Sequence, residues 1–297
     1  MRYVVGCTED ERGREAIALA RALARAPGAE LDLVHVLPGP GDQLRLAQER
    51  EYQQYLAGQA DAWLDKALAL VPADVTARKH IRTADSFAEG LIEAAEEFGA
   101  RLIVVGAASK GLFKRFTVGS VANALLHASH VPVALAPSGY RPPRDITRLT
   151  CALGTRPGAE TLLDVAVEAA AMRHVPLRVI SLVTLDAGHG RSAAEVESWA
   201  KSHAEITLAK AVEGVAKRTL VTAAVASGDS IEDAIERLDW DESEVVVIGS
   251  SRLAARSRIF LGTTANKMLR ALPVPMVVVP RDHVRLDEDP ELPADSD

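Results

Sequence analysis

The stretch that decides the fold runs from Leu102 to Asn123 and reads Leu-Ile-Val-Val-Gly-Ala-Ala-Ser-Lys-Gly-Leu-Phe-Lys-Arg-Phe-Thr-Val-Gly-Ser-Val-Ala-Asn. An apolar run typical of a buried strand stops at Gly106, and a loop of small and basic residues follows. Gly119 and Ser120 then begin a helical pattern. This order of strand, loop and helix occurs twice in the chain.

Three features recur at a spacing of 143 residues, which indicates a duplicated domain of about 140 residues. The matched pairs are Leu102–Gly106 with Val245–Gly249, Gly119-Ser120 with Gly262-Thr263, and Val131-Pro132-Val133 with Val274-Pro275-Met276. Residues 139–148 are rich in proline and charge, which favours an extended linker. We therefore expect one domain at residues 1–138 and a second at 149–281.

Short apolar runs alternate with helical patterns in both halves, and runs that are apolar on both faces predict a covered parallel sheet. The prediction is α/β: two tandem Rossmann-like domains, each a five-stranded parallel sheet with helices on both faces. Ligands of such sheets bind beyond the carboxyl ends of the strands. The expected strands are 2–6, 31–37, 76–82, 102–105, 131–136, 150–153, 177–183, 221–226, 245–248 and 275–279. The expected helices are 12–25, 44–70, 87–98 (capped by Ser86 and Gly99), 118–128, 161–173, 194–217, 230–238 and 263–271.

Composition excludes several classes of protein. The chain of 297 residues has two cysteines, Cys7 and Cys151, too few for a disulfide scaffold. Its net charge is −7, but residues 287–297 hold six acids and no base, so the rest is nearly neutral, which argues against nucleic-acid binding. No run is long and apolar enough to cross a membrane, and the first apolar run is too short for a signal peptide. We expect a cytoplasmic protein with a disordered acidic tail at 282–297.

The loop after residue 106 is the best candidate for chemistry. Glycine lets the backbone approach an anion, and the free N–H groups of a first helical turn can hold phosphate oxygens, here with the Ser120 hydroxyl. Lys110, Lys114 and Arg115 can neutralise a polyphosphate. The alternative is that Gly106 and Gly119 only serve turns and Ser120 only caps a helix. The residues by themselves leave both interpretations open.

With these motifs, each half resembles a universal stress protein domain, and the whole chain resembles a tandem universal stress protein. The family's nucleotide-binding pattern is Gly-x2-Gly-x9-Gly-(Ser/Thr). The first half follows that spacing, with serine at the second glycine, through Gly106, Ser109, Gly119 and Ser120, and Val121 comes next. The second half has arginine at the second glycine, in the series Gly249, Arg252, Gly262 and Thr263.

The resemblance implies that the first domain binds ATP, which Mg²⁺ can accompany, more readily than the second. It places adenine and ribose beside Val5, Gly6, Thr8 and Val36, with Thr8 where the family tends to have an acidic residue. It also implies that residues 131–136 and 274–279 pair within the chain as a pseudo-dimer, because each would otherwise be an unpaired apolar edge. A homodimer of chains is compatible with this arrangement, and the protein partners are unknown.

Other candidates have simpler explanations. His127 and His130 have a spacing that metal sites use, but no third ligand follows, and cationic groups at a helix end account for them. The two cysteines are expected to be packed strand thiols. Residues 239–244 are acidic but lack the spacing of a calcium loop, so we expect a solvated connection. We predict no metal site.

No catalytic set of residues can be read beside the loop, so the sequence predicts a binding protein with at most slow ATP hydrolysis. The first hypothesis is an ATP-binding regulatory protein of the stress response. The second is a nucleotide-free protein-interaction module, favoured by the two lost glycines at 109 and 252. The third is an ATP-using enzyme, which would need catalytic residues that the pattern does not reveal.

Overall fold

The computed structural model describes residues 1–39, 47–107, 119–141, 145–153, 159–184, 219–250 and 263–280, with isolated positions at 198, 202 and 206. The described strands form one ten-stranded sheet in the order β3-β2-β1-β4-β5-β10-β9-β6-β7-β8. The first-half strands are β1 (Arg2–Gly6), β2 (Glu30–Pro38), β3 (Ala77–Ala84), β4 (Leu102–Gly106) and β5 (Val133–Ala136). The second-half strands are β6 (Arg148–Ala152), β7 (Leu177–Thr184), β8 (Val221–Gly228), β9 (Glu244–Gly249) and β10 (Met276–Val279).

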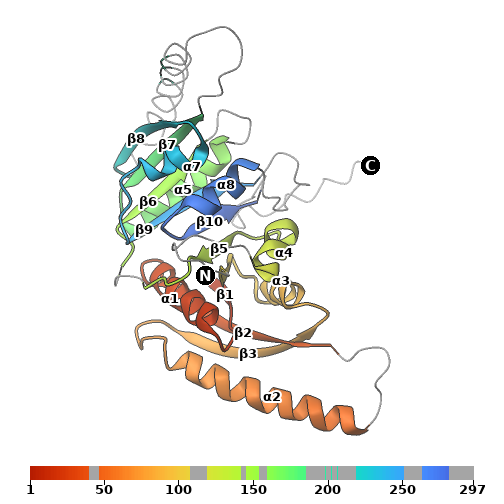
Figure 1. Cartoon of the computed structure of the whole chain (residues 1–297). Coiled ribbons are helices and arrows are strands. Elements are labelled where there is room, and N and C mark those ends of the chain that lie inside the picture. Colours follow the sequence, from red (N-terminus) through yellow and green to blue (C-terminus); the bar gives the residue numbers. More distant parts are fainter. Residues whose placement is uncertain are drawn as a thin grey trace, which may run out of the picture.

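The two halves lie end to end along this sheet and meet at β5 and β10 (Figure 1). Within each half every strand pair is parallel, as predicted. The β5–β10 pair is antiparallel, with Leu135 opposite Met276 and Val133 opposite Val278. The expected intrachain pairing is therefore present, and it saturates backbone groups that two separate domains would expose at their edges.

Helices cover both faces of the sheet. They are α1 (Glu11–Arg25), α2 (Ala47–Leu68), α3 (Phe87–Phe98), α4 (Ser120–Ala128), α5 (Ala159–Arg173), α7 (Ile231–Glu236) and α8 (Thr263–Ala271). Side chains of α1, α2 and α5 share one hydrophobic cluster, and those of α3, α4, α7 and α8 share the other. The expected helix at 194–217 and the acidic tail at 282–297 lie outside the described residues.

Local signals account for the best-predicted helices. Ser86 caps α3 by accepting a hydrogen bond from the Glu89 N–H, and Gly99 ends it in the left-handed region at φ 59°. In α1, Ile17, Ala20 and Ala24 have the spacing of one helix face, and all three are buried. The apolar residues of the central strands are buried on both faces because a helical layer lies on each side.

Candidate functional site

The carboxyl edge of β1 and β4 is the place where a sheet of this topology binds ligands. From β1 the chain passes through α1 to β2 on one side, whereas from β4 it passes through α4 to β5 on the other. Open sheets of this kind bind ligands at such a reversal of strand order. Gly6 and Gly106 end the two strands there. The second half has the matching reversal between β6 and β9.

The amino terminus of α4 follows this edge without a side-chain cap. Gly119 is the N-cap residue, in extended conformation at φ −69° and ψ 164°, and its carbonyl accepts from the Asn123 N–H at 2.9 Å. Among the described residues no side chain bonds to the first turn, which also contains no acidic residue. The first N–H groups, including those of Ser120 and Val121, therefore present a positive partial charge that suits an anion.

Gly106 has a packing role that its counterpart in the second half lacks. A Cβ atom built on Gly106 would lie 2.3 Å from the backbone oxygen of Arg12, in the first turn of α1. At Gly249 the nearest atom is Cδ2 of Leu162 at 3.5 Å, an ordinary van der Waals distance. Close approach of α1 therefore requires glycine at 106, which supports the structural explanation for this residue.

The loop after β1 is tied to α1 through Asp10, which sequence reasoning did not single out. The Asp10 carboxylate accepts from the Thr8 hydroxyl at 2.5 Å and caps α1 through the Gly13 N–H at 3.4 Å. Arg12 forms an ion pair with it at 2.5 Å. Burial alone would raise the pKa of Asp10, but the bonds from Thr8, Arg12 and Gly13 hold it below its ordinary value. The sequence signal that could have identified Asp10 is its position just before a helical pattern, where aspartate often caps a helix.

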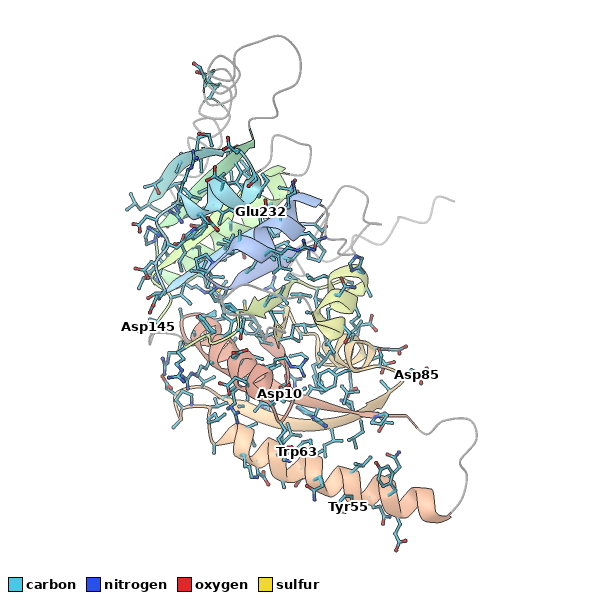
Figure 2. The ribbon with its side chains drawn as sticks, viewed as in Figure 1. Asp10, Tyr55, Trp63, Asp85, Asp145 and Glu232 are labelled. Atoms are coloured by element: carbon cyan, nitrogen blue, oxygen red, sulfur yellow. The ribbon has the colours of Figure 1, made fainter. Side chains whose placement is uncertain are left out.

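The expected adenosine-contact residues lie at the same edge but face different layers. His35 holds the loop through a 2.7 Å contact between its Nδ1 and the Cys7 carbonyl, and its ring meets Trp63 edge-on at 5.4 Å between centroids. Val5 belongs to the cluster on the α1 side and Val36 to the cluster on the α3 side. Figure 2 shows Asp10 at α1 and Trp63 between α2 and the sheet.

Several predicted site residues lie outside the described part of the chain. They are Ser109, Lys110, Lys114, Arg115, Arg252 and Gly262. Thr263 begins α8, and its side chain is not described. The structure therefore brings Gly6, Thr8, Gly106 and the start of α4 to one edge and leaves the basic loop as a prediction.

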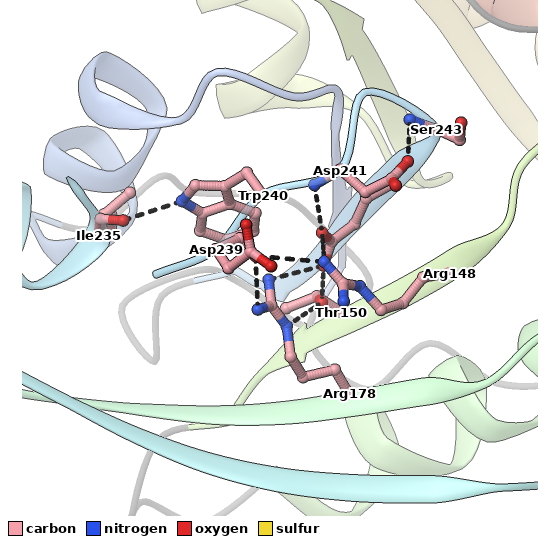
Figure 3. A network of polar contacts seen from close by, with 9 residues as sticks. Arg148, Thr150, Arg178, Ile235, Asp239, Trp240, Asp241 and Ser243 are labelled. Atoms are coloured by element: carbon pink, nitrogen blue, oxygen red, sulfur yellow. Dashed lines mark hydrogen bonds and ion pairs between the residues drawn. The ribbon is translucent and has the colours of Figure 1, made fainter. Parts of the chain in front are cut away.

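The opposite, amino-terminal edge of the second half holds a dense network of charges (Figure 3). Glu244 is fully buried and accepts from Arg148 at 2.6 Å, from Arg178 at 2.8 Å and from the Thr150 hydroxyl. Arg178 also stacks over Trp240, with 4.8 Å between its Cζ and the ring centroid. The expectation of a solvated connection at 239–244 is therefore wrong for Glu244, because Arg148 on the neighbouring strand β6 and Arg178 on β7 pair with it.

The amino-terminal edge of the first half also holds a buried ion-pair network, formed by different residues. Asp32 is fully buried and accepts two bonds from Arg2, at 2.6 and 2.8 Å, and one contact from His80 at 2.8 Å. Arg2 in turn lies over the Phe98 ring. Both networks join neighbouring strands at the edge opposite the α4 terminus, and their charges are paired, so their role is structural.

The remaining sequence candidates have ordinary environments. Cys7 and Cys151 are buried, and burial raises the pKa of each thiol to about 12. His127 contacts the Asn123 carbonyl at 2.6 Å and His130 lies 3.4 Å from Glu96. Among the described residues no group of three potential ligands is placed to hold a metal, and no helix is long and apolar enough to span a membrane.

Comparison with known proteins agrees with this architecture. A family model described as the universal stress protein family matches the chain twice, over residues 1–137 and 146–280. The chain belongs to the universal stress protein family.

The curated relatives align with nearly the whole chain, across both domains. Universal stress protein Rv2319c of Mycobacterium tuberculosis and Mb2346c of Mycobacterium bovis are each 29% identical over 304 residues, covering 94% of this chain and all of the relative. A universal stress protein structure from Archaeoglobus fulgidus covers 94% of this chain and 98% of its own, with a TM-score of 0.67 and 18% identity, which shows the fold. A universal stress protein solved in complex with cAMP covers 36% of this chain and 75% of its own, at 23% identity and a TM-score of 0.27.

Proposed function

We propose that this universal stress protein binds ATP at the carboxyl edge of β1 and β4 and acts as a regulatory binding protein in the stress response. The observation that carries the proposal is the amino terminus of α4, which follows that edge with no side-chain cap among the described residues. A helix start of this kind is suited to phosphate oxygens. The switch in strand order lies beside it, and open sheets of this kind bind ligands at that point.

In this proposal the phosphates lie against the N–H groups of Ser120 and Val121, beside Gly119. Ser109, Lys110, Lys114 and Arg115 complete the loop, and Mg²⁺ would accompany the triphosphate. Adenosine lies by Val5, Gly6, Thr8 and Val36. Another family member has been solved with cAMP, an observation about that protein. The matching second-half loop, with Arg252 in place of the small Ser109, is the weaker candidate.

The test uses the full chain and compares two substitutions at Gly119 whose side chains have the same size. Gly119→Glu places a carboxylate at the start of α4, where it repels phosphate, whereas Gly119→Gln adds a side chain of the same size without charge. Glutamate is favourable at a helix start, so loss of binding would not reflect loss of α4. ATP binding is measured by calorimetry, and nucleotide released from freshly purified, denatured protein is identified by chromatography.

We expect Gly119→Glu to lose binding at least tenfold more than Gly119→Gln. Gly262→Glu, at the matching second-half position, should leave binding close to that of the parent. Equal binding by the parent and Gly119→Glu would overturn the phosphate assignment. Loss only in Gly262→Glu would move the site to the second half.

Two observations favour a second candidate, the nucleotide-free interaction module. The geometry at Gly106 is accounted for by its contact with Arg12, and the Thr8 hydroxyl already donates to Asp10. Neither residue then needs a ligand to explain it. If the parent protein co-purifies without nucleotide and millimolar ATP and Mg²⁺ leave its melting temperature unchanged, this second function is favoured.

A further inference from the structure

Helices α1 and α5 are equivalent, which allows the surroundings of the two to be compared position by position. Both helices end in the same turn: the Ala29 N–H donates to the Ala24 carbonyl at 3.0 Å, and the Val175 N–H donates to the Ala170 carbonyl at 3.1 Å. The left-handed residues Gly28 (φ 62°) and His174 (φ 54°) lie in these turns. Each residue of α1 therefore matches the residue 146 positions later in α5.

The linker between the domains lies against α1. It leaves β5 at Pro137, and the Gly139 N–H donates to the carboxylate of Glu15 on α1. Tyr140 packs against the hydrophobic cluster that contains α1, and Ile146 is buried in the same cluster. Along this side of α1, the stripe formed by Glu15, Leu19 and Ala22 is buried.

The matching stripe of α5 is not covered in the same way. Its positions are Thr161, which is exposed, and Val165 and Glu168, which are partly exposed. On the sheet below, Val277 of β10 is partly exposed, whereas the matching Ala134 of β5 is fully buried. The second half therefore exposes apolar surface at the place where the first half is closed.

This exposed surface borders a cavity of about 150 Å³ between α5 and the sheet. Its apolar wall includes Val165, Ala169 and Met172 of α5 and Val277 and Val279 of β10, and it reaches Met1 and Tyr3 at the start of β1. The cavity thus spans residues of both halves beside the β5–β10 junction. It lies away from the carboxyl edge proposed for nucleotide.

The cavity also carries positive charge. Among the described residues, the charged side chains that line it are Arg101, Arg173 and Glu168. The guanidinium of Arg173 donates to the carbonyls of Ala169 and Leu23 and to the Tyr3 hydroxyl, all neutral oxygens. Its Nε is buried and has no hydrogen-bond partner among the described residues. The surroundings suit an apolar segment that also carries carboxylates.

Residues 281–297 start at the position from which the linker starts in the first half. Pro280 follows β10 as Pro137 follows β5, at the spacing of 143 that relates the two strands. Eleven residues, 137–147, suffice to cross from β5 to β6. The seventeen residues after Pro280 are long enough for the same path. They begin Arg-Asp-His-Val-Arg-Leu-Asp-Glu-Asp, with apolar residues at 284 and 286 and three acids at 287–289.

We propose that residues 281–289 of this chain dock in the cavity beside α5, in the way that the linker packs beside α1. In an extended segment Val284 and Leu286 lie on the same side, so both face the apolar wall. The acids at 287–289 then reach Arg101 and Arg173 near the start of β1. The docked segment covers the open stripe of α5 and connects the two halves across their junction.

A cross-linking experiment in the full chain tests the position of the segment. Val165→Cys with Val284→Cys places one thiol on the cavity wall and one on the segment. Asp164→Cys with Val284→Cys is the matched control, because residue 164 is exposed on the neighbouring face of α5. The native thiols are buried and do not compete.

Under mild oxidation we expect an intramolecular disulfide in the Val165→Cys, Val284→Cys pair. The Asp164→Cys, Val284→Cys pair should give a much lower yield of intramolecular disulfide. Equal yields in the two pairs would overturn the proposal. A Val165 product found only between two chains would also overturn it, because the occupant would then be a second copy of the protein.

A second measurement needs no cysteine. Val284→Asp with Leu286→Asp should weaken docking, and Leu292→Asp, which lies beyond the docking segment, is the control. Hydrogen exchange of the α5 amides should lose protection in the double variant and stay at the parent level in the control. Unchanged protection in the double variant would refute docking, and circular dichroism verifies that all three proteins are folded.

Discussion

Replacing Gly106 and Gly249 by alanine, one at a time, tests whether the two equivalent glycines have the different roles that the structure assigns. Both end a central strand, and neither is among the described residues with positive φ, so alanine suits the backbone at both. The environments differ: the added methyl meets the Arg12 backbone oxygen at 2.3 Å in the first case and the Leu162 side chain at 3.5 Å in the second.

The expected magnitudes follow from these distances. A contact of 2.3 Å is more than 1 Å inside the usual separation of about 3.5 Å, and the obstructing atom belongs to the backbone of α1. Such overpacking costs about 1–3 kcal/mol, or roughly 2–12 °C in melting temperature for a domain of this size. At Gly249 the methyl fits, and reduced freedom of the unfolded chain should stabilise the protein by about 0.4–1 kcal/mol.

Urea and thermal unfolding, followed by circular dichroism, measure both effects. Equal losses of stability in the two variants, or an unchanged melting temperature for Gly106→Ala, would refute the argument. ATP binding by the same proteins adds a second result. If Gly106 serves packing alone, the folded Gly106→Ala variant keeps an affinity close to that of the parent below its melting temperature.

Three further predictions follow. Glu244→Ala should cost about 3–5 kcal/mol in urea unfolding, because it leaves Arg148 and Arg178 without their buried carboxylate, and a cost below about 1 kcal/mol would contradict a structural role. Cys7 and Cys151 should resist a thiol reagent at pH 8 in the folded protein and react after unfolding, since burial raises the pKa of both thiols to about 12. Rapid labelling of the folded protein would contradict their burial. Burial raises the pKa of Glu15 despite the hydrogen bond from Gly139, so the folded state binds that proton more tightly and the free energy of unfolding falls as the pH rises above 4.5. Glu15→Gln should flatten this fall, measured by urea unfolding at several pH values. Parallel stability–pH curves for the parent and the variant would contradict this prediction.

Much of the fold was predictable because its signals are local. Ser86 and Gly99 mark the ends of α3, and the alternation of apolar strands with amphipathic helices predicts the parallel sheet. The resemblance to the universal stress protein family also predicts the meeting of β5 and β10, since each would otherwise be an unpaired apolar edge. For the site, the sequence identifies the glycine at the start of α4 but not the carboxylate of Asp10, which joins Thr8, Arg12 and Gly13.

The sequence by itself determined the duplication, the order of elements and the ends of α3, because each depends on residues a few positions apart or on an exact repeat. Only the tertiary structure distinguished Gly106 from Gly249, placed Glu244 in an arginine network, and revealed that a stripe of α5 is partly exposed where the matching stripe of α1 is buried. These properties arise from contacts between residues far apart in the chain. Their energies depend on interatomic distances of a few ångströms, which helical and strand periodicity does not specify.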